Sequence, residues 1–227
     1  MKNILLLLTI TGLNFSLLNA QKAEDYYENA KNGRAVSQYN LAVCYDEGLG
    51  VEVRKDSAVY WLEKAAVQQH TSAMYNLGVH YFNGEGVDTN YYLAAYWFQQ
   101  AAEKGVVQAM LNLGNCYKDS LGVERDMEKA LYWLNKAYDN GATEAALSLG
   151  YIYFYGLGTK KEVFKAIEFW EAAAEKNIAE AQYNLATCYE QGIGVKKDII
   201  QSTYWYTRSS VNGYDKATQR LKDYQRK

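Results

Sequence analysis

Residues 73–108 of this 227-residue chain read AMYNLGVHYFNGEGVDTNYYLAAYWFQQAAEKGVVQ, and this stretch decides the fold. Its main residue types recur every 36 residues, five times, without an insertion. One column of the repeat is leucine: Leu41, Leu77, Leu113, Leu149 and Leu185. Columns of Tyr, Gly and Ala keep the same step, as does a Trp column in which Phe169 replaces Trp in the fourth copy. A fixed period of this length predicts a solenoid, whose stacked copies bury the apolar face that one copy cannot hide alone.

Each copy contains two predicted helices. Leu41, Cys44 and Tyr45 are spaced i, i+3 and i+4, which is one stripe of a 3.6-residue helical period. The Gly-x-Gly segment that follows predicts the end of this helix, because glycine accepts the left-handed conformation found at helix ends. The same apolar spacing then returns in a second helix: Ala58, Trp61, Leu62 and Ala65.

Polar residues that favour helix caps precede three of the second helices: Asn90, Asp126 and Asp198, with Arg54 and Glu162 at the other two. Small residues follow the Leu column and precede the Trp column, which lets helices approach closely while Trp and Tyr rings fill the space between them. We therefore expect the Trp column in the core. Trp133→Ala should then destabilise the protein by about 3–5 kcal/mol.

The first twenty residues predict a secretory signal peptide. A positive start at Lys2 precedes an apolar run, and the segment ends on the small residue Ala20 before the chain turns polar. An uncleaved anchor and a buried helix are the other interpretations. We expect an exported protein, periplasmic or secreted, with no integral membrane segment after signal cleavage.

The expected domain organisation is repeats between two capping helices. Its segments are a signal peptide (1–20), an N-terminal capping helix (21–36), five repeats within 37–216 (37–72, 73–108, 109–144, 145–180 and 181–216) and a C-terminal capping helix (217–227). The outer face of the last helix is expected to carry Lys216, Arg220, Lys222 and Arg226.

The pattern of copy two resembles the Sel-one-like repeat (SLR), a longer-looped relative of the tetratricopeptide repeat. The matching residues are Tyr75-Asn76-Leu77-Gly78, Tyr81, Gly84-Glu85-Gly86-Val87, Ala94, Trp97 and Ala101-Ala102-Glu103-Lys104-Gly105. The resemblance covers about residues 37–217, with local departures at Ser120, Thr159 and Ser202. It implies an all-α, right-handed α-solenoid of five helix-turn-helix repeats whose first helices line a concave face. It also implies an adaptor or scaffold role.

That face is the expected binding site. An asparagine precedes the Leu column in four copies: Asn40, Asn76, Asn112 and Asn184, with Ser148 in copy four. Related tetratricopeptide proteins place an asparagine here to hold a peptide backbone or carboxylate. We call this column the asparagine ladder. Five further residues are expected beside it: Tyr39, Tyr75, Tyr183, Asn115 and Tyr151. We expect a peptide or protein partner here; the other interpretation is that the asparagines bond their own neighbouring loops.

Catalysis is not expected, although some cysteine-rich members of the family have been described as β-lactamase-like or penicillin-binding. The chain contains no Ser-x-x-Lys, Ser-Asp-Asn or Lys-Thr-Gly motif. We expect no catalytic residue, no cofactor and, from a net charge of -2 with both signs interspersed, no nucleic acid. A self-associating envelope structural protein is the remaining alternative to the expected monomer.

The cysteines are expected in the core. They occupy one column in alternate copies, which places them too far apart for a disulfide: Cys44, Cys116 and Cys188. His80 and Ile152 occupy the same column in the other two copies. The two histidines of the chain have no ligand spacing, so no metal site is expected.

Overall fold

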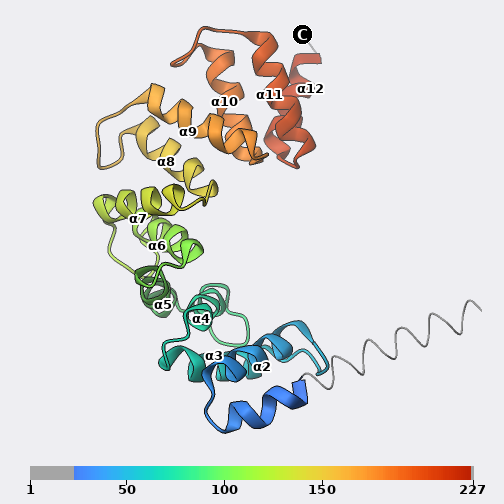
Figure 1. Cartoon of the computed structure of the whole chain (residues 1–227). Helices are drawn as coiled ribbons and strands as arrows, with labels where there is room; N and C mark the ends of the chain where they lie inside the picture. Colours follow the sequence, from blue (N-terminus) through green and yellow to red (C-terminus); the bar gives the residue numbers. More distant parts are fainter. Residues whose placement is uncertain (1–22, 226–227) are drawn as a thin grey trace, which may run out of the picture. The chain divides into compact units, whose positions relative to one another are not determined.

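The structure is a computed structural model that describes residues 23–225 (Figure 1). These residues form helices and no strand, which confirms the all-α fold class. A helix at 23–31 is followed by α2 (Ala35–Glu47), α3 (Lys55–Val67), α4 (Thr71–Asn83), α5 (Tyr91–Glu103), α6 (Val107–Asp119), α7 (Met127–Asp139), α8 (Glu144–Tyr155), α9 (Val163–Glu175), α10 (Ala179–Gln191), α11 (Ile199–Val211) and α12 (Asp215–Gln225). The predicted signal peptide lies outside the described residues. Within residues 23–225, no helix combines the length and apolarity needed to cross a bilayer.

The helices belong to two compact units. Among the described residues, the first unit contains 23–109 together with 121–123, and the second contains 110–120 and 124–225. In unit 1, α2 packs on α3, α3 on α4, and α4 on α5. In unit 2, each helix from α7 to α12 packs on the next helix along the chain. Packing between sequence neighbours is the pattern of a solenoid, in which local contacts replace a single central core.

The first helix of each pair ends on a left-handed residue. In four copies it is a glycine with φ between 68° and 73°: Gly48, Gly84, Gly156 and Gly192. Ser120 takes this position in copy three and adopts the same conformation, with φ of 60°. The departure at Ser120 therefore changes the residue but not the conformation that ends the helix.

Helix caps lie where the sequence predicted them. The side chains of Asn90 and Asp126 each accept a hydrogen bond of 3.0 Å from the backbone N–H three residues later. Asp198 accepts two, from Ile200 and Gln201. Among the second helices, α3 and α9 have no side-chain cap, because Arg54 and Glu162 stand at their cap positions.

The core differs from the expectation for the Trp column. Trp133 is only partly buried, and its ring packs edge-on against Tyr132 at 5.0 Å. The fully buried column lies one residue later: Leu62, Phe98, Leu134, Trp170 and Tyr206. This column faces the first helix of its own pair, where small residues make room; a Cβ added to Gly114 would lie 2.7 Å from Leu134. The expectation that the Trp column fills the core was therefore wrong for Trp133.

The cysteine column is buried in every copy, as the sequence predicted. Its members are at most 4% exposed: Cys44, His80, Cys116, Ile152 and Cys188. Burial raises the pKa of the Cys116 and Cys188 thiols to about 11. Because thiolates are the reactive form, these two thiols are unreactive near neutral pH.

The Arg220 side chain of α12 is 39% exposed, and its guanidinium also bonds Glu190 of α10, which the sequence did not predict. Its Nε donates to Glu190 Oε2 at 3.2 Å, and a second guanidinium nitrogen bonds Glu190 Oε1. Tyr206 OH also donates to Glu190, at 2.8 Å. Glu190 therefore joins α10, α11 and α12 through charge-assisted hydrogen bonds.

Stability should depend on the ionisation of Glu190. Burial opposes its charge, but hydrogen bonds from Arg220 and Tyr206 outweigh this and hold the pKa of Glu190 below its ordinary value. A lowered pKa in the folded state contributes stability above the unfolded-state pKa of about 4.3 and loses it as pH falls through the folded-state value. We expect Glu190→Gln to lower the melting temperature at pH 7 and to match the wild type at acid pH. The control is Glu52→Gln, which replaces an exposed carboxylate. If the melting temperatures of the wild type and Glu190→Gln depended on pH in the same way, this account would be contradicted.

Candidate partner-binding face

The predicted site residues all lie on first helices, and together they are called the first-helix face. They are Tyr39 and Asn40 on α2, Tyr75 and Asn76 on α4, Asn112 and Asn115 on α6, Tyr151 on α8, and Tyr183 and Asn184 on α10. Each of these side chains is half-buried. The face is described separately in each unit.

In unit 1, two asparagine amides lie beside fixed aromatic rings. Within residues 23–225, the amides of Asn40 and Asn76 make no hydrogen bond. Tyr39 stacks on His70 with ring centroids 4.6 Å apart, and Tyr75 packs near Phe98 at 6.0 Å. The rings are held by neighbouring helices, whereas the amide donors and acceptors stay available to a ligand.

In unit 2, the face begins with a hydrogen-bond network between first helices. Ser148 Oγ on α8 donates to Asn115 Oδ1 on α6 at 2.7 Å, and Lys118 Nζ donates to Ser148 Oγ at 3.4 Å. The amide of Asn112 makes no hydrogen bond to the described residues. Ser148, which stands in the asparagine ladder of copy four, is therefore hydrogen-bonded within the protein. The side chain of Asn112 in copy three is not hydrogen-bonded to the described residues.

The network continues between α8 and α10. Tyr151 OH donates to Glu180 Oε1 at 2.8 Å and lies 3.5 Å from Asn184 Oδ1. Burial raises the pKa of Tyr151, so its hydroxyl stays a donor at neutral pH. Among the described residues, Asn184 Nδ2 is buried without a hydrogen-bond partner. Asn184 therefore pairs with a neighbouring first helix, and not with a loop, while one of its donors stays open.

Tyrosine rings surround this part of the face. Tyr183 lies between Tyr206 and Tyr214, with centroid distances of 5.4 and 5.1 Å. Tyr151 stacks nearly parallel on Tyr155, whose ring is mostly exposed. Unit 2 therefore offers a rigid aromatic surface next to one unsatisfied amide donor.

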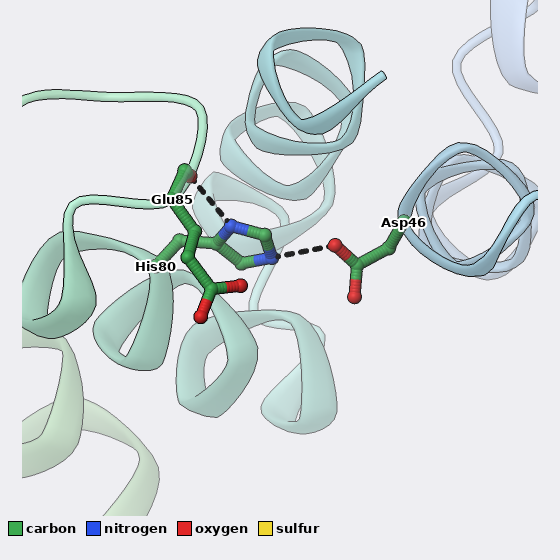
Figure 2. Close-up of side chains that lie close together, drawn as sticks. All are labelled: Asp46, His80 and Glu85. Carbon is green, nitrogen blue, oxygen red and sulfur yellow. Dashed lines mark hydrogen bonds and ion pairs between the residues drawn. The ribbon is translucent and has the colours of Figure 1, made fainter. Parts of the chain in front are cut away.

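The sequence analysis missed one cluster, in unit 1. Asp46, His80 and Glu85 come together there, and one ligand atom from each lies within 4.8 Å of the others (Figure 2). Among residues 23–225 this is the single group of three or more such side chains that could hold a metal ion. A search for paired histidines could not find it, because its ligands come from different copies and include only one histidine.

The repeated helix pairs define an all-helical repeat protein. The chain belongs to the Sel1 repeat family: the Sel1 repeat model matches residues 35–70, 71–106, 107–141, 143–178 and 179–214. This confirms the resemblance drawn from sequence. Proteins built from Sel1 repeats generally act in protein–protein interaction.

Solved structures agree with this assignment. A Sel1 repeat protein from Oxalobacter formigenes is similar over 88% of this chain and 84% of its own length, with 31% identity and a TM-score of 0.78. A protective antigen of uropathogenic Escherichia coli that displays an SLR fold is also 31% identical, with a TM-score of 0.52. That match covers 89% of this chain and 51% of the antigen. A comparison with curated proteins finds no match.

Proposed function

We propose that the protein is an exported interaction module that binds a peptide, or an extended segment of a protein, on its first-helix face. One observation carries the proposal: the half-buried amides of Asn40, Asn76 and Asn112 make no hydrogen bond within residues 23–225. A side-chain amide offers both a donor and an acceptor, which is the complement of a peptide group. Asn40 and Asn76 stand in successive copies of unit 1, so their amides suit a ligand that runs along both copies.

The aromatic rings beside the amides support the same function. Tyr39 and Tyr75 are already packed against His70 and Phe98, so a ligand would meet rings whose conformational entropy has been lost on folding. Preorganised rings raise affinity because less ordering is left to oppose binding. Rigid aromatic anchors beside polar groups are typical of the residues that dominate protein interfaces.

Export is part of the proposal and rests on the signal-like segment at residues 1–20. The thiols of Cys116 and Cys188 are buried and have raised pKa values, so an oxidising compartment would not readily couple them. Separating the culture medium, periplasm and cytoplasm of producing cells tests the location. Recovery of the full-length chain in the cytoplasm alone would contradict export.

Loss of two amides should weaken partner binding without unfolding the protein. In Asn40→Ala/Asn76→Ala, each lost hydrogen bond should cost about 0.5–1.5 kcal/mol, so affinity should fall by roughly 5–150-fold. The partner is first identified by cross-linking in producing cells and mass spectrometry, and its affinity is then measured by calorimetry. Asn32→Ala, an exposed asparagine in the turn before α2, is the matched control.

Equal affinity of the wild type and the double variant, with unchanged unfolding curves, would place the binding site elsewhere. A mass that rises with protein concentration would favour the self-associating alternative. Turnover of a chromogenic β-lactam that is lost on replacing a single serine would favour the alternative of a β-lactamase-like enzyme.

A further inference from the structure

A charged cluster lies at the junction of the first two copies, inside unit 1. Asp46 stands near the end of α2, His80 lies on α4, and Glu85 follows in the turn after α4 (Figure 2). The His80 side chain is 5% exposed, so its ring nitrogens are shielded from bulk water. A buried imidazole needs a partner for each nitrogen, since an unpaired polar group in the interior is costly.

The hydrogen bonds of His80 fix the role of each ring nitrogen. Its Nδ1 lies 2.8 Å from the backbone carbonyl oxygen of Glu85, which can only accept, so Nδ1 carries the proton. The other ring nitrogen, Nε2, lies 3.4 Å from Asp46 Oδ1 (Figure 2). His80 and the carboxylates of Asp46 and Glu85 therefore lie together. An imidazole nitrogen beside carboxylate oxygens is a donor set that transition-metal ions accept.

The repeat itself supplies an internal comparison. At the position of His80 the other copies carry apolar or weakly polar residues: Cys44, Cys116, Ile152 and Cys188. At the position of Glu85 they carry only aliphatic residues: Leu49, Leu121, Leu157 and Ile193. The repeat fold therefore forms this junction without a histidine or a carboxylate. Both departures occur in one copy and face the same carboxylate, Asp46.

We propose that Asp46, His80 and Glu85 bind a divalent transition-metal ion, for which Zn²⁺ is the best fit. A tetrahedral zinc ion with bonds of about 2.0–2.1 Å places its ligand atoms about 3.3 Å apart. The 3.4 Å between His80 Nε2 and Asp46 Oδ1 meets that requirement, and one ligand atom from each of the three residues lies within 4.8 Å of the others. Three protein ligands leave the fourth position to water.

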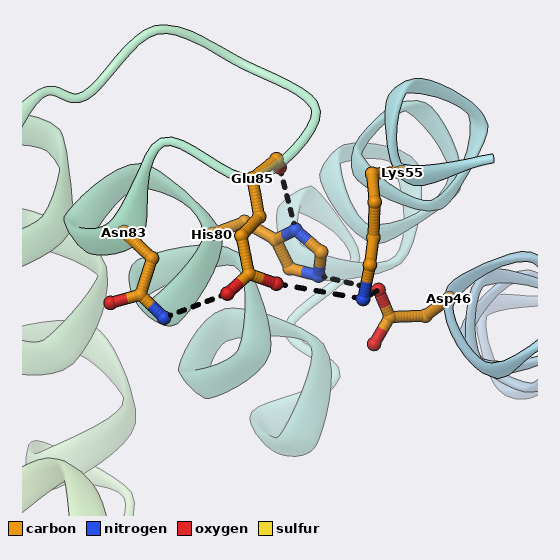
Figure 3. Close-up of polar contacts among 5 residues, drawn as sticks. All are labelled: Asp46, Lys55, His80, Asn83 and Glu85. Carbon is orange, nitrogen blue, oxygen red and sulfur yellow. Dashed lines mark hydrogen bonds and ion pairs between the residues drawn. The ribbon is translucent and has the colours of Figure 1, made fainter. Parts of the chain in front are cut away.

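The surroundings of His80 match those of a metal ligand. A ligating histidine commonly donates its other ring N–H to a backbone carbonyl or carboxylate, which fixes the ring and its tautomer. His80 makes this bond to Glu85 O. The nitrogen ligand favours zinc-like ions over Mg²⁺ and Ca²⁺, which prefer oxygen ligands alone. Asn83 orients the Glu85 carboxylate by donating to Oε1 at 3.1 Å (Figure 3).

Lys55 holds the two carboxylates when no metal ion is bound. Its Nζ lies 2.6 Å from Asp46 Oδ1 and 3.5 Å from Glu85 Oε2 (Figure 3). The ammonium and a metal ion would compete for the same oxygens, so metal binding requires Lys55 to move away. Its side chain is 37% exposed and sits at the start of α3, which leaves it room to swing into solvent.

Calorimetric titration of the full, untagged chain with ZnCl₂ tests the site. We expect one ion per chain and no heat from MgCl₂. His80→Ile and Glu85→Leu, which install residues that other copies carry, should each weaken zinc binding at least about tenfold. Lys55→Met, which copies Met127 of the third repeat, should tighten binding because it removes the competing ammonium. The control is His70→Asn, which changes the other histidine and keeps a side chain able to cap α4.

Absence of zinc binding by the wild type, or unchanged affinity in both His80→Ile and Glu85→Leu, would overturn the proposal. The cluster could act as a metal site or as an ion-pair cluster only. Lys55→Met distinguishes these two roles even if His80→Ile fails to fold. Tighter zinc binding supports a metal site, whereas lower stability with unchanged zinc affinity would leave an ion-pair cluster only. Circular dichroism of each variant shows which of them are folded.

Discussion

Gly122→Ala should cost about 2–5 kcal/mol of unfolding free energy, as the sum of backbone strain and a steric clash. Gly122 has φ of +71°, a conformation that costs alanine about 1–2 kcal/mol. A Cβ at this position would lie 1.9 Å from the carbonyl oxygen of Tyr91 and 2.5 Å from the backbone nitrogen of Tyr92. Because these are main-chain atoms at the start of α5, no change of rotamer relieves the clash, and α5 must shift.

Gly105→Ala is the matched control for this substitution. Gly105 has φ of +92°, and a Cβ there would meet nothing within 4 Å. It should show the strain without the clash, a loss of about 1–2 kcal/mol. Urea unfolding of both variants, followed by circular dichroism, measures the difference. Equal losses at the two positions would contradict the close packing of this turn against α5.

Leu134→Ala should cost about 2–5 kcal/mol, the range for truncating a fully buried leucine. Leu134 is 0% exposed and fills the space beside Gly114 on the facing helix. Removing its side chain leaves a cavity that Gly114, having no side chain, cannot fill. The loss therefore includes both the transfer free energy of the leucine and the cavity.

Trp133→Ala should cost less than Leu134→Ala, although tryptophan is the larger residue. Trp133 is partly exposed, and its ring contacts surface residues, with Tyr132 on one edge and Lys136 5.1 Å from its centroid. Much of the space left by the ring would open to water and not remain an empty cavity. Urea unfolding of the two variants ranks them. A larger loss for Trp133→Ala would show that the Trp column, and not the column after it, forms the core.

The fold could be predicted from sequence because its information is local and repeated. The apolar spacing within each copy predicts its two helices, and the recurrence of five copies at one fixed period predicts a solenoid. The caps at Asn90, Asp126 and Asp198 are predictable for the same reason, since a cap depends on residues three positions apart.

The choice between neighbouring columns could not be predicted. Trp133 and Leu134 are adjacent apolar residues, and a helical period alone places both near the same stripe. Which one is buried depends on the angle at which α7 meets α6. Leu134 is the residue that lies against Gly114, and this contact arises from tertiary packing that the apolar spacing does not specify.

The position of the candidate residues on the first helices could be predicted from sequence, but their hydrogen-bond partners could not. The repeat register places the asparagines on the first helices, yet it does not show that Ser148 bonds Asn115 or that Tyr151 lies beside Asn184. The Asp46, His80 and Glu85 cluster was missed for the same reason. Its one visible signal was the departure of His80 and Glu85 from columns that are otherwise apolar or weakly polar.

Photo-cross-linking in producing cells tests the binding face most directly. Benzoylphenylalanine is placed at Asn76 or Asn112 on first helices, and at Tyr96 or Tyr132, which are exposed on second helices. The account predicts that light couples a partner polypeptide to positions 76 and 112 and not to positions 96 and 132. Coupling from positions 96 and 132 alone would contradict it and place the partner on the second helices.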